Sequence, residues 1–225
     1  MERYLNEIVS WLRSNPVALS SNSVDGRVNS IANEDEILDS LCESPFGRLI
    51  DRPRARAWYD FAIITSEGEL FVNLKVSDLS NSAADNLSSK QGMGYALTGI
   101  KDLPDNWTKF NEIIGGNLRG GFDYYFLIVN KNDATDVFWT SLKRIERLQP
   151  NGNNLPFQCN WAGNRNWSNR SEEEAMEYIL KIYLESWNKK ISGYPGEIKA
   201  LLDRGEIHSV MHYGRLSEMR AYRIC

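Results

Sequence analysis

The sequence predicts an α/β fold, in which a β-sheet of at least four strands is accompanied by helices. Apolar residues recur at helical spacing over 1–14 and again over 171–190. Between these segments, residues 58–77 alternate between apolar and polar, and residues 122–145 are dense in aromatic and β-branched side chains. The chain has 225 residues, of which 42% are apolar and 11% aromatic, enough for a substantial core. A disordered chain, a fibre and a disulfide-held mini-protein are therefore excluded.

Two helices are predicted before the first strand. Residues 1–14 place apolar side chains on one helical face, and Pro16 follows where the helix should end. The polar stretch 20–30 then predicts a loop or a short hairpin. Asn33 and Glu36 have the spacing of a helix N-terminal cap, so the second helix is expected to begin near residue 34.

The strands are predicted in two groups. Residues 58–77 predict a β-hairpin around a Glu-Gly turn. Residues 78–99 are small and polar with little periodicity, which predicts a loop with at most one helical turn. Residues 122–131 then predict a strand that is buried on both faces, with residues 136–145 as its neighbour in the sheet.

The segment 149–170 is too polar to be expected in a core, because it contains seven Asn, two Gln, two Trp and two Arg residues. Ser171 and Glu174 then form a capping-box pattern, which predicts a helix that runs to about Lys190. A turn, a short helix over 197–205 and a C-terminal arm are expected to follow.

Several classes of function are disfavoured. The longest uncharged apolar run, at 126–129, is far shorter than the roughly 18 residues of a membrane-spanning helix, and the N-terminus is amphipathic, unlike a signal peptide. We therefore expect a cytoplasmic protein with no membrane partner. There is no Walker loop and no Gly-x-Gly-x-x-Gly, so no nucleotide cofactor is expected. The net charge of −4 argues against coating nucleic acid by bulk charge, but it leaves room for a locally positive cleft.

Zinc and thiol chemistry are also not expected. The three cysteines include no Cys-x-x-Cys pair. His208 and His212 are four positions apart, but they lack the intervening Glu of a zinc-protease helix, so surface or packing roles are the simpler interpretation.

The residues that suggest chemistry lie in the hairpin. Asp60 falls in the first strand, and Asn73 and Lys75 fall on one face of the second, so the hairpin can bring all three to one end of the sheet. A lysine between Leu74 and Val76 on a buried strand needs a partner for its charge. The alternative is a solvent-facing Asn-x-Lys on a half-exposed hairpin.

This arrangement resembles the PD-(D/E)XK nucleases and, within them, the blunt-cutting type II restriction endonucleases of the EcoRV and HincII kind. In that family one strand bears the first aspartate and the next carries acid-x-Lys, positions held here by Asp60, Asn73 and Lys75. The likeness continues in order over about 34–190, through the polar segment KVSDLSNSAADNLSSKQGMGYAL, the strand FDYYFLIVNK and the loop QCNWAGNRNWSN. It implies a restriction-endonuclease-like fold with a mixed central β-sheet flanked by helices. On this basis we expect a single domain over 1–225, with an N-terminal helix and loop (1–33), a catalytic core (34–148), a DNA-recognition loop (149–170) and a helix with a C-terminal arm (171–225).

The resemblance implies a Mg²⁺-dependent type II restriction endonuclease, a homodimer that cuts double-stranded DNA at a palindromic site. Asp60, Asn73 and the backbone carbonyl of Leu74 would bind Mg²⁺, and Lys75 would orient or activate the attacking water. Asn73 departs from the family pattern, since an amide oxygen brings no negative charge. It is a natural variant, an inactivating change or a sign of misalignment. A repair nuclease of the same fold and a catalytically silent DNA-binding protein are the alternatives.

The 149–170 segment would supply base recognition, because Asn can form paired hydrogen bonds with adenine and Arg with guanine. The candidates are Asn160, Asn164, Arg165, Asn166 and Asn169. An ordinary Asn-rich surface loop is the alternative. Before the hairpin, Arg52 and Arg54, with Arg48 and Arg56 beside them, could contact phosphates or form a solvated basic stretch. Glu43 resembles an auxiliary acid of some family members, although an exposed helical Glu is the simpler interpretation.

Overall fold

The computed structural model describes residues 1–20, 26–54, 57–81, 83–87 and 89–192. The predicted short helix at 197–205, the C-terminal arm and both histidines lie outside these residues.

The centre of the fold is a five-stranded β-sheet in the order β1-β2-β3-β5-β6. β3 and β5 run parallel, whereas the other neighbouring strands run antiparallel. The predicted hairpin, the buried strand and its neighbour are therefore confirmed, and the sheet is mixed. The strands are β1 (Ile50–Asp51), β2 (Phe61–Thr65), β3 (Gly68–Ser77), β5 (Tyr125–Asn130) and β6 (Asp133–Ser141).

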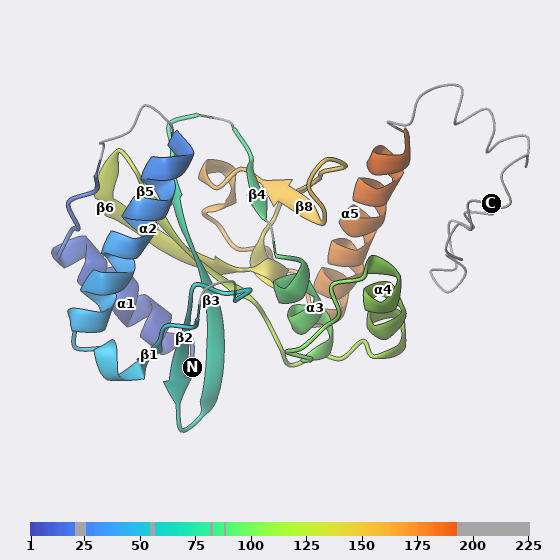
Figure 1. Cartoon of the computed structure of the whole chain (residues 1–225), viewed down its shortest axis with the longest axis horizontal. Coiled ribbons are helices and arrows are strands. Elements are labelled where there is room, and N and C mark those ends of the chain that lie inside the picture. The colour runs from blue at the N-terminus through green and yellow to red at the C-terminus, as the bar shows by residue number, and fades with distance from the viewer. Residues whose placement is uncertain (21–25, 55–56, 82, 88, 193–225) are drawn as a thin grey trace, which may run out of the picture.

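Helices flank this sheet on both sides, as predicted. Figure 1 shows α1 and α2 on one side and α3, α4 and α5 on the other. Since side chains alternate along a strand, β3 feeds two cores: Phe71 points to the core that α3, α4 and α5 share, and Val72 points to the core that α1 and α2 share. The helices are α1 (Arg3–Ser14), α2 (Gly26–Glu43), α3 (Lys90–Thr98), α4 (Trp107–Gly116) and α5 (Glu172–Ser192).

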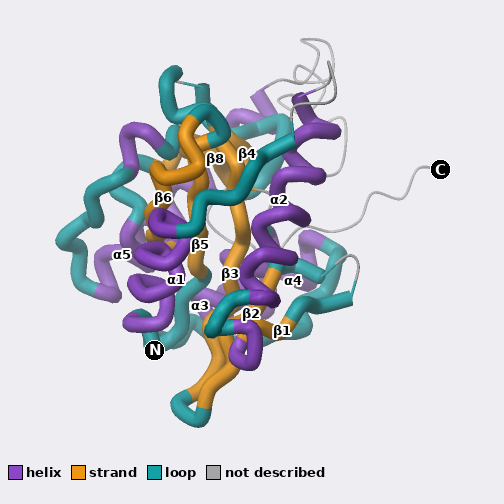
Figure 2. The backbone as a smooth tube through the Cα atoms, turned by 90° about the vertical axis from the view of Figure 1, so that its left-hand side faces the viewer, coloured by secondary structure: helices purple, strands orange, loops and turns teal. Residues whose placement is uncertain are grey.

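A second, three-stranded sheet has the order β4-β8-β7, and all of its pairs are antiparallel. Figures 1 and 2 show β4 and β8 near the upper end of β3. The Oγ of Ser77, the last residue of β3, donates a hydrogen bond to Asp85 Oδ2 at 2.6 Å, which ties the two sheets together. The strands are β4 (Asp85–Leu87), β7 (Leu148–Pro150) and β8 (Phe157–Cys159), and short 3-10 helices lie at Gly47–Leu49, Leu142–Arg144 and Ala162–Asn164.

The predicted start of the second helix is wrong, because α2 begins at Gly26 rather than near residue 34. Asn33 is buried inside the helix. The Glu36 carboxylate accepts hydrogen bonds from the backbone N–H and the hydroxyl of Ser20. The cap-like spacing therefore reflects a bond between the helix and the preceding segment.

The loop predicted over 78–99 is also wrong, since it contains β4 and α3. α3 forms because its glycines allow close packing: a Cβ at Gly92 would approach the Tyr124 ring to 2.4 Å, and one at Gly94 would approach Leu103 to 2.2 Å. α4 was not predicted at all. Its cap is Asn106, whose side chain accepts from Lys109 N at 3.1 Å.

The polar segment 149–170 contributes to the core, contrary to the prediction. Phe157, Cys159 and Trp161 are almost completely buried there. The helix after it begins as predicted, because Ser171 N donates to the Glu174 carboxylate at 2.7 Å while Glu174 N donates to Ser171 Oγ at 3.3 Å. None of the described helices combines the length and apolar character that crossing a membrane requires.

Candidate functional site

The candidate site lies at the edge of β3 just beyond its last pair with β2. The backbone N–H of Asp60, the residue before β2, donates to the carbonyl of Val72 at 2.9 Å. The pairing of β2 with β3 ends at Phe61 and Val72, so the next β3 amide on this side needs another acceptor. Asp60 provides it, because its Oδ2 accepts a hydrogen bond from Leu74 N at 2.7 Å. The carboxylate is thereby held against the strand edge.

Asn73 and Lys75 lie on the face of β3 that also carries Phe71. Their register partners in β5 are Phe126 and Ile128, which are fully buried. Asn73 and Lys75 are partly buried themselves, at the border between this core and the strand edge. The structure therefore brings the three predicted residues together at one end of the hairpin.

A second acidic side chain reaches this edge from α2. The Glu34 carboxylate accepts a hydrogen bond from the backbone N–H of Val76 and interacts electrostatically with both Lys75 and Asp60. Burial raises the pKa of Glu34 from 4.5 to about 7, and the negative charge of Asp60 adds to this rise, while Lys75 opposes it. Glu34 is thus the acid that α2 contributes to this edge. Glu43, the candidate from the sequence, lies exposed at the end of the same helix.

The sequence holds a signal that Glu34 is a partly buried acid, although it does not specify where on the sheet this residue lies. Glu34 precedes the buried residues Ile37, Leu38 and Leu41 by three, four and seven positions, so it shares their helical face. A carboxylate on the apolar face of a helix is costly to bury without a partner. This pattern predicts that Glu34 has a polar or charged partner on the side of α2 that packs against the sheet.

The pKa of Asp60 is also raised. Burial raises the pKa of its carboxyl group above the ordinary value, although Lys75 and the hydrogen bond from Leu74 lower it in part. Two partly buried acidic groups therefore share one neighbouring ammonium group, that of Lys75, at this edge.

Tyr124 supports the site from the core. Its hydroxyl donates to the carbonyl of Trp58 at 2.7 Å and also contacts the Asn73 side chain. Burial raises the pKa of Tyr124 well above 10, so the phenol stays neutral. Tyr124 therefore fixes both the segment that leads into Asp60 and the amide of Asn73.

The oxygen atoms at this edge are of the kinds that bind magnesium in proteins. Asp60 and Glu34 offer carboxylates, and Asn73 offers an amide oxygen. The Leu74 carbonyl points to the same edge as its N–H, since both groups of a strand residue face the same neighbour. Within the described part of the chain, no three His, Cys, Asp or Glu side chains form a complete metal cluster, so the amide and the carbonyl would have to complete the ligand set.

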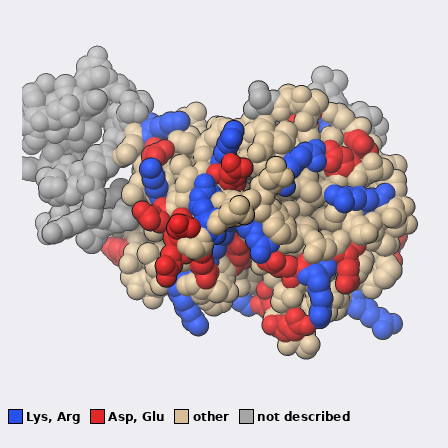
Figure 3. Space-filling model, turned by 180° about the vertical axis from the view of Figure 1, so that it is seen from behind, with Lys and Arg blue, Asp and Glu red and all other residues tan. Residues whose placement is uncertain are grey.

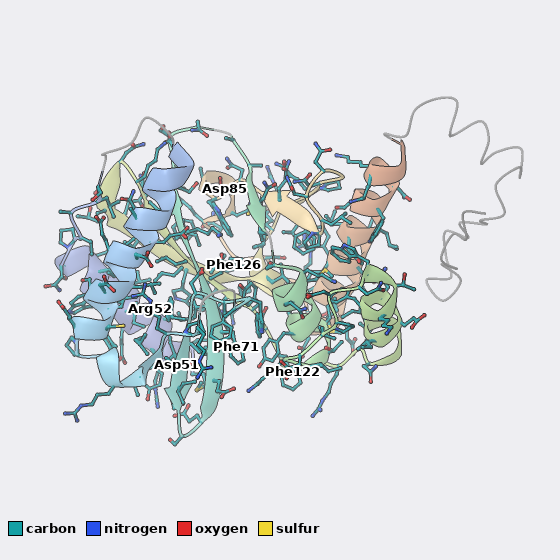
Figure 4. The ribbon with its side chains drawn as sticks, viewed as in Figure 1. Asp51, Arg52, Phe71, Asp85, Phe122 and Phe126 are labelled. Carbon is teal, nitrogen blue, oxygen red and sulfur yellow. The ribbon has the colours of Figure 1, made fainter. Side chains whose placement is uncertain are left out.

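Arg52, one of the arginines predicted to contact phosphates, lies beside α2. Arg52 forms ion pairs with Asp35 at 2.5 Å and Asp39 at 2.6 Å, so acidic partners already balance its charge. Figure 4 shows Arg52 next to the lower half of α2. Arg54 is exposed, and Arg56 lies outside the described residues.

The structure divides the predicted base-reading residues into two groups. Asn164 is only 2% exposed, and its side chain bonds to the backbone of Arg147 and Asn160. The Asn160 amide likewise donates to the carbonyls of Asn81 and Ala83. Both amides are therefore bonded to backbone groups of the protein itself, and in this conformation both residues stabilise the shape of the loop.

Arg165, Asn166 and Asn169 form the second, exposed group. Arg165 makes two hydrogen bonds with Asp136, at 2.8 and 2.6 Å. Asn166 is exposed, and Asn169 lines a shallow cavity of about 520 Å³ between the loop and α5. Figure 3 shows the face of the molecule seen from behind, where acidic and basic side chains are intermixed over the described surface.

No protein-family model and no curated protein matches the chain significantly. The case for a function therefore depends on the residues themselves.

Proposed function

We propose that the chain is a Mg²⁺-dependent endonuclease that hydrolyses phosphodiester bonds of double-stranded DNA. The observation that carries the proposal is the meeting of Asp60, Lys75 and Glu34 at the open edge of β3. Phosphodiester hydrolysis needs positive charge against the phosphate, a group that positions water and a group that accepts its proton.

The side chains can divide these tasks. Lys75 directs a cationic donor toward the edge and can hold a water molecule and a phosphate oxygen in line. Glu34 has a pKa of about 7, so near neutral pH a substantial fraction is ionised and can accept a proton from that water. Asp60, Asn73 and the Leu74 carbonyl would bind Mg²⁺, which when bound supplies positive charge at the phosphate.

The finer proposal is a type II restriction endonuclease that acts in the cytoplasm as a homodimer at a palindromic site. Each chain provides one candidate site, so cutting both strands at a two-fold site is most simply done by two chains. Blunt cutting follows only from the resemblance of the hairpin and the later segments to that family.

A catalytically silent DNA-binding protein is the second candidate, and Asn73 is the observation in its favour. An amide in place of the second carboxylate removes one negative charge from the metal ligands, which lowers Mg²⁺ affinity. On our first proposal, Asp60, the Asn73 amide and the Leu74 carbonyl still bind Mg²⁺, and the nearby Glu34 carboxylate adds negative charge at this edge when it is ionised.

Plasmid cleavage tests the proposal. We expect wild-type protein with Mg²⁺ to convert supercoiled plasmid into discrete linear products, and Lys75→Ala to lose this activity. Binding of Lys75→Ala to duplex DNA, measured in Ca²⁺, should remain. A folded Lys75→Ala protein that cleaves at the wild-type rate would contradict the assignment, and a wild-type protein that binds DNA without cutting it would favour the silent alternative.

A further inference from the structure

The outward face of the small sheet carries a row of carboxamide side chains, which we call the amide row. It consists of Asn86 in β4, Gln158 in β8 and Gln149 in β7, and these residues are direct partners in the strand register. Asn86 and Gln149 are exposed and Gln158 is partly buried. Three amides therefore stand side by side across the sheet.

Hydrogen bonds fix these amides. Asn151, which is only 8% exposed, donates through its Nδ2 to Asn86 Oδ1 at 2.6 Å and to Gln158 Oε1 at 3.0 Å. Gln158 Nε2 in turn donates to Gln149 Oε1 at 3.4 Å. These bonds occupy oxygen atoms of the row, so each amide has a defined orientation. Among the described residues, none accepts a hydrogen bond from the NH₂ group of Asn86 or Gln149.

The other face of the same sheet is core. Leu87, Phe157 and Cys159 are buried there against the central sheet and α5. The strands that carry the outward amides are therefore held firmly. A rigid, ordered row loses little further conformational entropy when it binds a ligand.

The geometry suits the edges of stacked bases. Adjacent strands are about 4.8 Å apart, so the row spans roughly 10 Å, comparable with the approximately 12 Å width of the DNA major groove. The NH₂ groups of Asn86 and Gln149 can donate to N7, O6 or O4 acceptors of bases. Each amide oxygen of the row accepts one internal hydrogen bond and keeps a second lone pair, which can accept from the adenine N6 amino group and complete a paired contact. A neutral row also avoids the charge repulsion that carboxylates would meet near phosphates.

Two connections link the row to the rest of the proposed nuclease. The hydrogen bond from Ser77 to Asp85 joins β4 to the end of β3, the strand that carries Lys75. At the opposite rim, Lys189 Nζ donates to the carbonyl of Pro150, next to Gln149, which places a cationic side chain beside the row. Basic residues at the rim of a polar surface are typical of proteins that bind a phosphate backbone.

We propose that the amide row reads base edges in the major groove and sets the sequence preference of the protein. The inference rests on the proposed endonuclease function. It assigns base reading to Asn86, Gln149 and Gln158. None of these is among the candidates that the sequence predicted, although Gln149 and Gln158 lie in the predicted 149–170 loop.

Selection from a random DNA pool tests the inference. The probe is a pool of short duplexes with a randomised centre, bound in Ca²⁺ in place of Mg²⁺, after which the bound fraction is sequenced. The variants are Asn86→Ala and Gln149→Ala, together with Asn86→Asp, which keeps the acceptor for Asn151 but loses the outward NH₂ group. The matched controls are Asn188→Ala and Asn188→Asp, at an exposed amide of α5, and circular dichroism checks that each protein is folded.

We expect the wild-type protein to enrich a short motif. Each amide-row variant should lose about 5- to 150-fold of the preference at individual base pairs, as expected for a lost paired contact, while affinity for the unselected pool changes little. The Asn188 variants should keep the wild-type motif.

Other results separate the two proposals. Folded amide-row variants that enrich the wild-type motif with undiminished preference would overturn the amide row as a reader and leave the endonuclease proposal intact. A wild-type protein that cleaves plasmid but enriches no motif would also overturn the amide row as a reader and leave the endonuclease proposal intact. A wild-type protein that neither binds the pool nor cleaves plasmid would instead overturn the endonuclease function itself. If Asn86→Ala fails to fold, Asn86→Asp and the exposed Gln149→Ala decide the question.

Discussion

Replacing Glu34 with Gln should make the stability of the protein less sensitive to pH. The Glu34 carboxyl group has a pKa of about 7 in the folded chain, compared with 4.5 in the absence of burial. The folded state therefore binds a proton that the unfolded state releases between these two values. As pH rises through this window, the free energy of unfolding of the wild-type protein falls, because charging Glu34 in its partly buried position is costly.

The size of the effect follows from the pKa shift. One pKa unit corresponds to about 1.4 kcal/mol, so the shift of Glu34 sets an upper limit of roughly 3.5 kcal/mol. Water reaches the strand edge in part, and Lys75 can move closer to the charged form, so we expect about 1–3 kcal/mol. Glu34→Gln keeps the shape of the side chain but removes the ionisation.

Chemical denaturation at a series of pH values measures this. The stability of Glu34→Gln relative to wild type should rise by about 1–3 kcal/mol between pH 5 and pH 8.5. Glu43→Gln, at the exposed end of the same helix, is the matched control and should show no such trend. If the free energies of unfolding of wild type and Glu34→Gln change with pH in the same way, the conclusion that burial raises the pKa of Glu34 is refuted.

Three further predictions concern the site and its surroundings. Asn73→Asp should reduce the Mg²⁺ concentration needed for half-maximal cleavage, because a carboxylate binds Mg²⁺ more strongly than an amide does, and an unchanged Mg²⁺ titration would show that this side chain is not a ligand. Arg54→Ala should weaken binding to specific and random duplexes alike and reduce the salt dependence, whereas Asn166→Ala should weaken mainly the specific complex; equilibrium binding at several salt concentrations distinguishes these outcomes. Gly92→Ala should destabilise the protein by about 1–3 kcal/mol, because the new methyl group would overlap the Tyr124 ring, and thermal unfolding that matches wild type would contradict this packing.

The hairpin and the central strands were predictable because their signals are local. The alternation over 58–77 reports directly which side chains face a core, and the two-residue turn between Thr65 and Gly68, one residue earlier than predicted, fixes the register of the hairpin. The same applies to the capping box of Ser171 and Glu174, whose two reciprocal bonds lie within a single turn.

The segments that were mispredicted depend on distant partners. α3 contains Gly92 and Gly94, which are poor helix formers, and it forms because Tyr124 and Leu103 pack into the space that the glycines leave. The start of α2 was misplaced because Glu36 bonds to Ser20 rather than to the N-terminus of its own helix. Such contacts have no signature in sequence spacing.

The candidate site was predictable in part for the same reason. The hairpin register alone brings Asp60, Asn73 and Lys75 together. The arrival of Glu34 depends on how α2 crosses the sheet, which a single sequence does not specify. The amide row likewise requires β8 to pair with β4, a strand far earlier in the sequence. Gln149 and Gln158 lie in the segment expected to read bases but were not among its candidates, and Asn86 lies in a segment expected to be a loop.

The most direct test of the central claim is the plasmid cleavage rate of Asp60→Asn in Mg²⁺. An asparagine can still accept the hydrogen bond from Leu74 N, so the strand edge and the fold should be preserved, while the negative charge of the metal ligand is lost. We predict that the rate falls by at least about a hundredfold relative to wild type, as expected when a main source of electrostatic stabilisation is removed. A folded Asp60→Asn protein that cuts plasmid at the wild-type rate would show that this edge of β3 is not the site of hydrolysis.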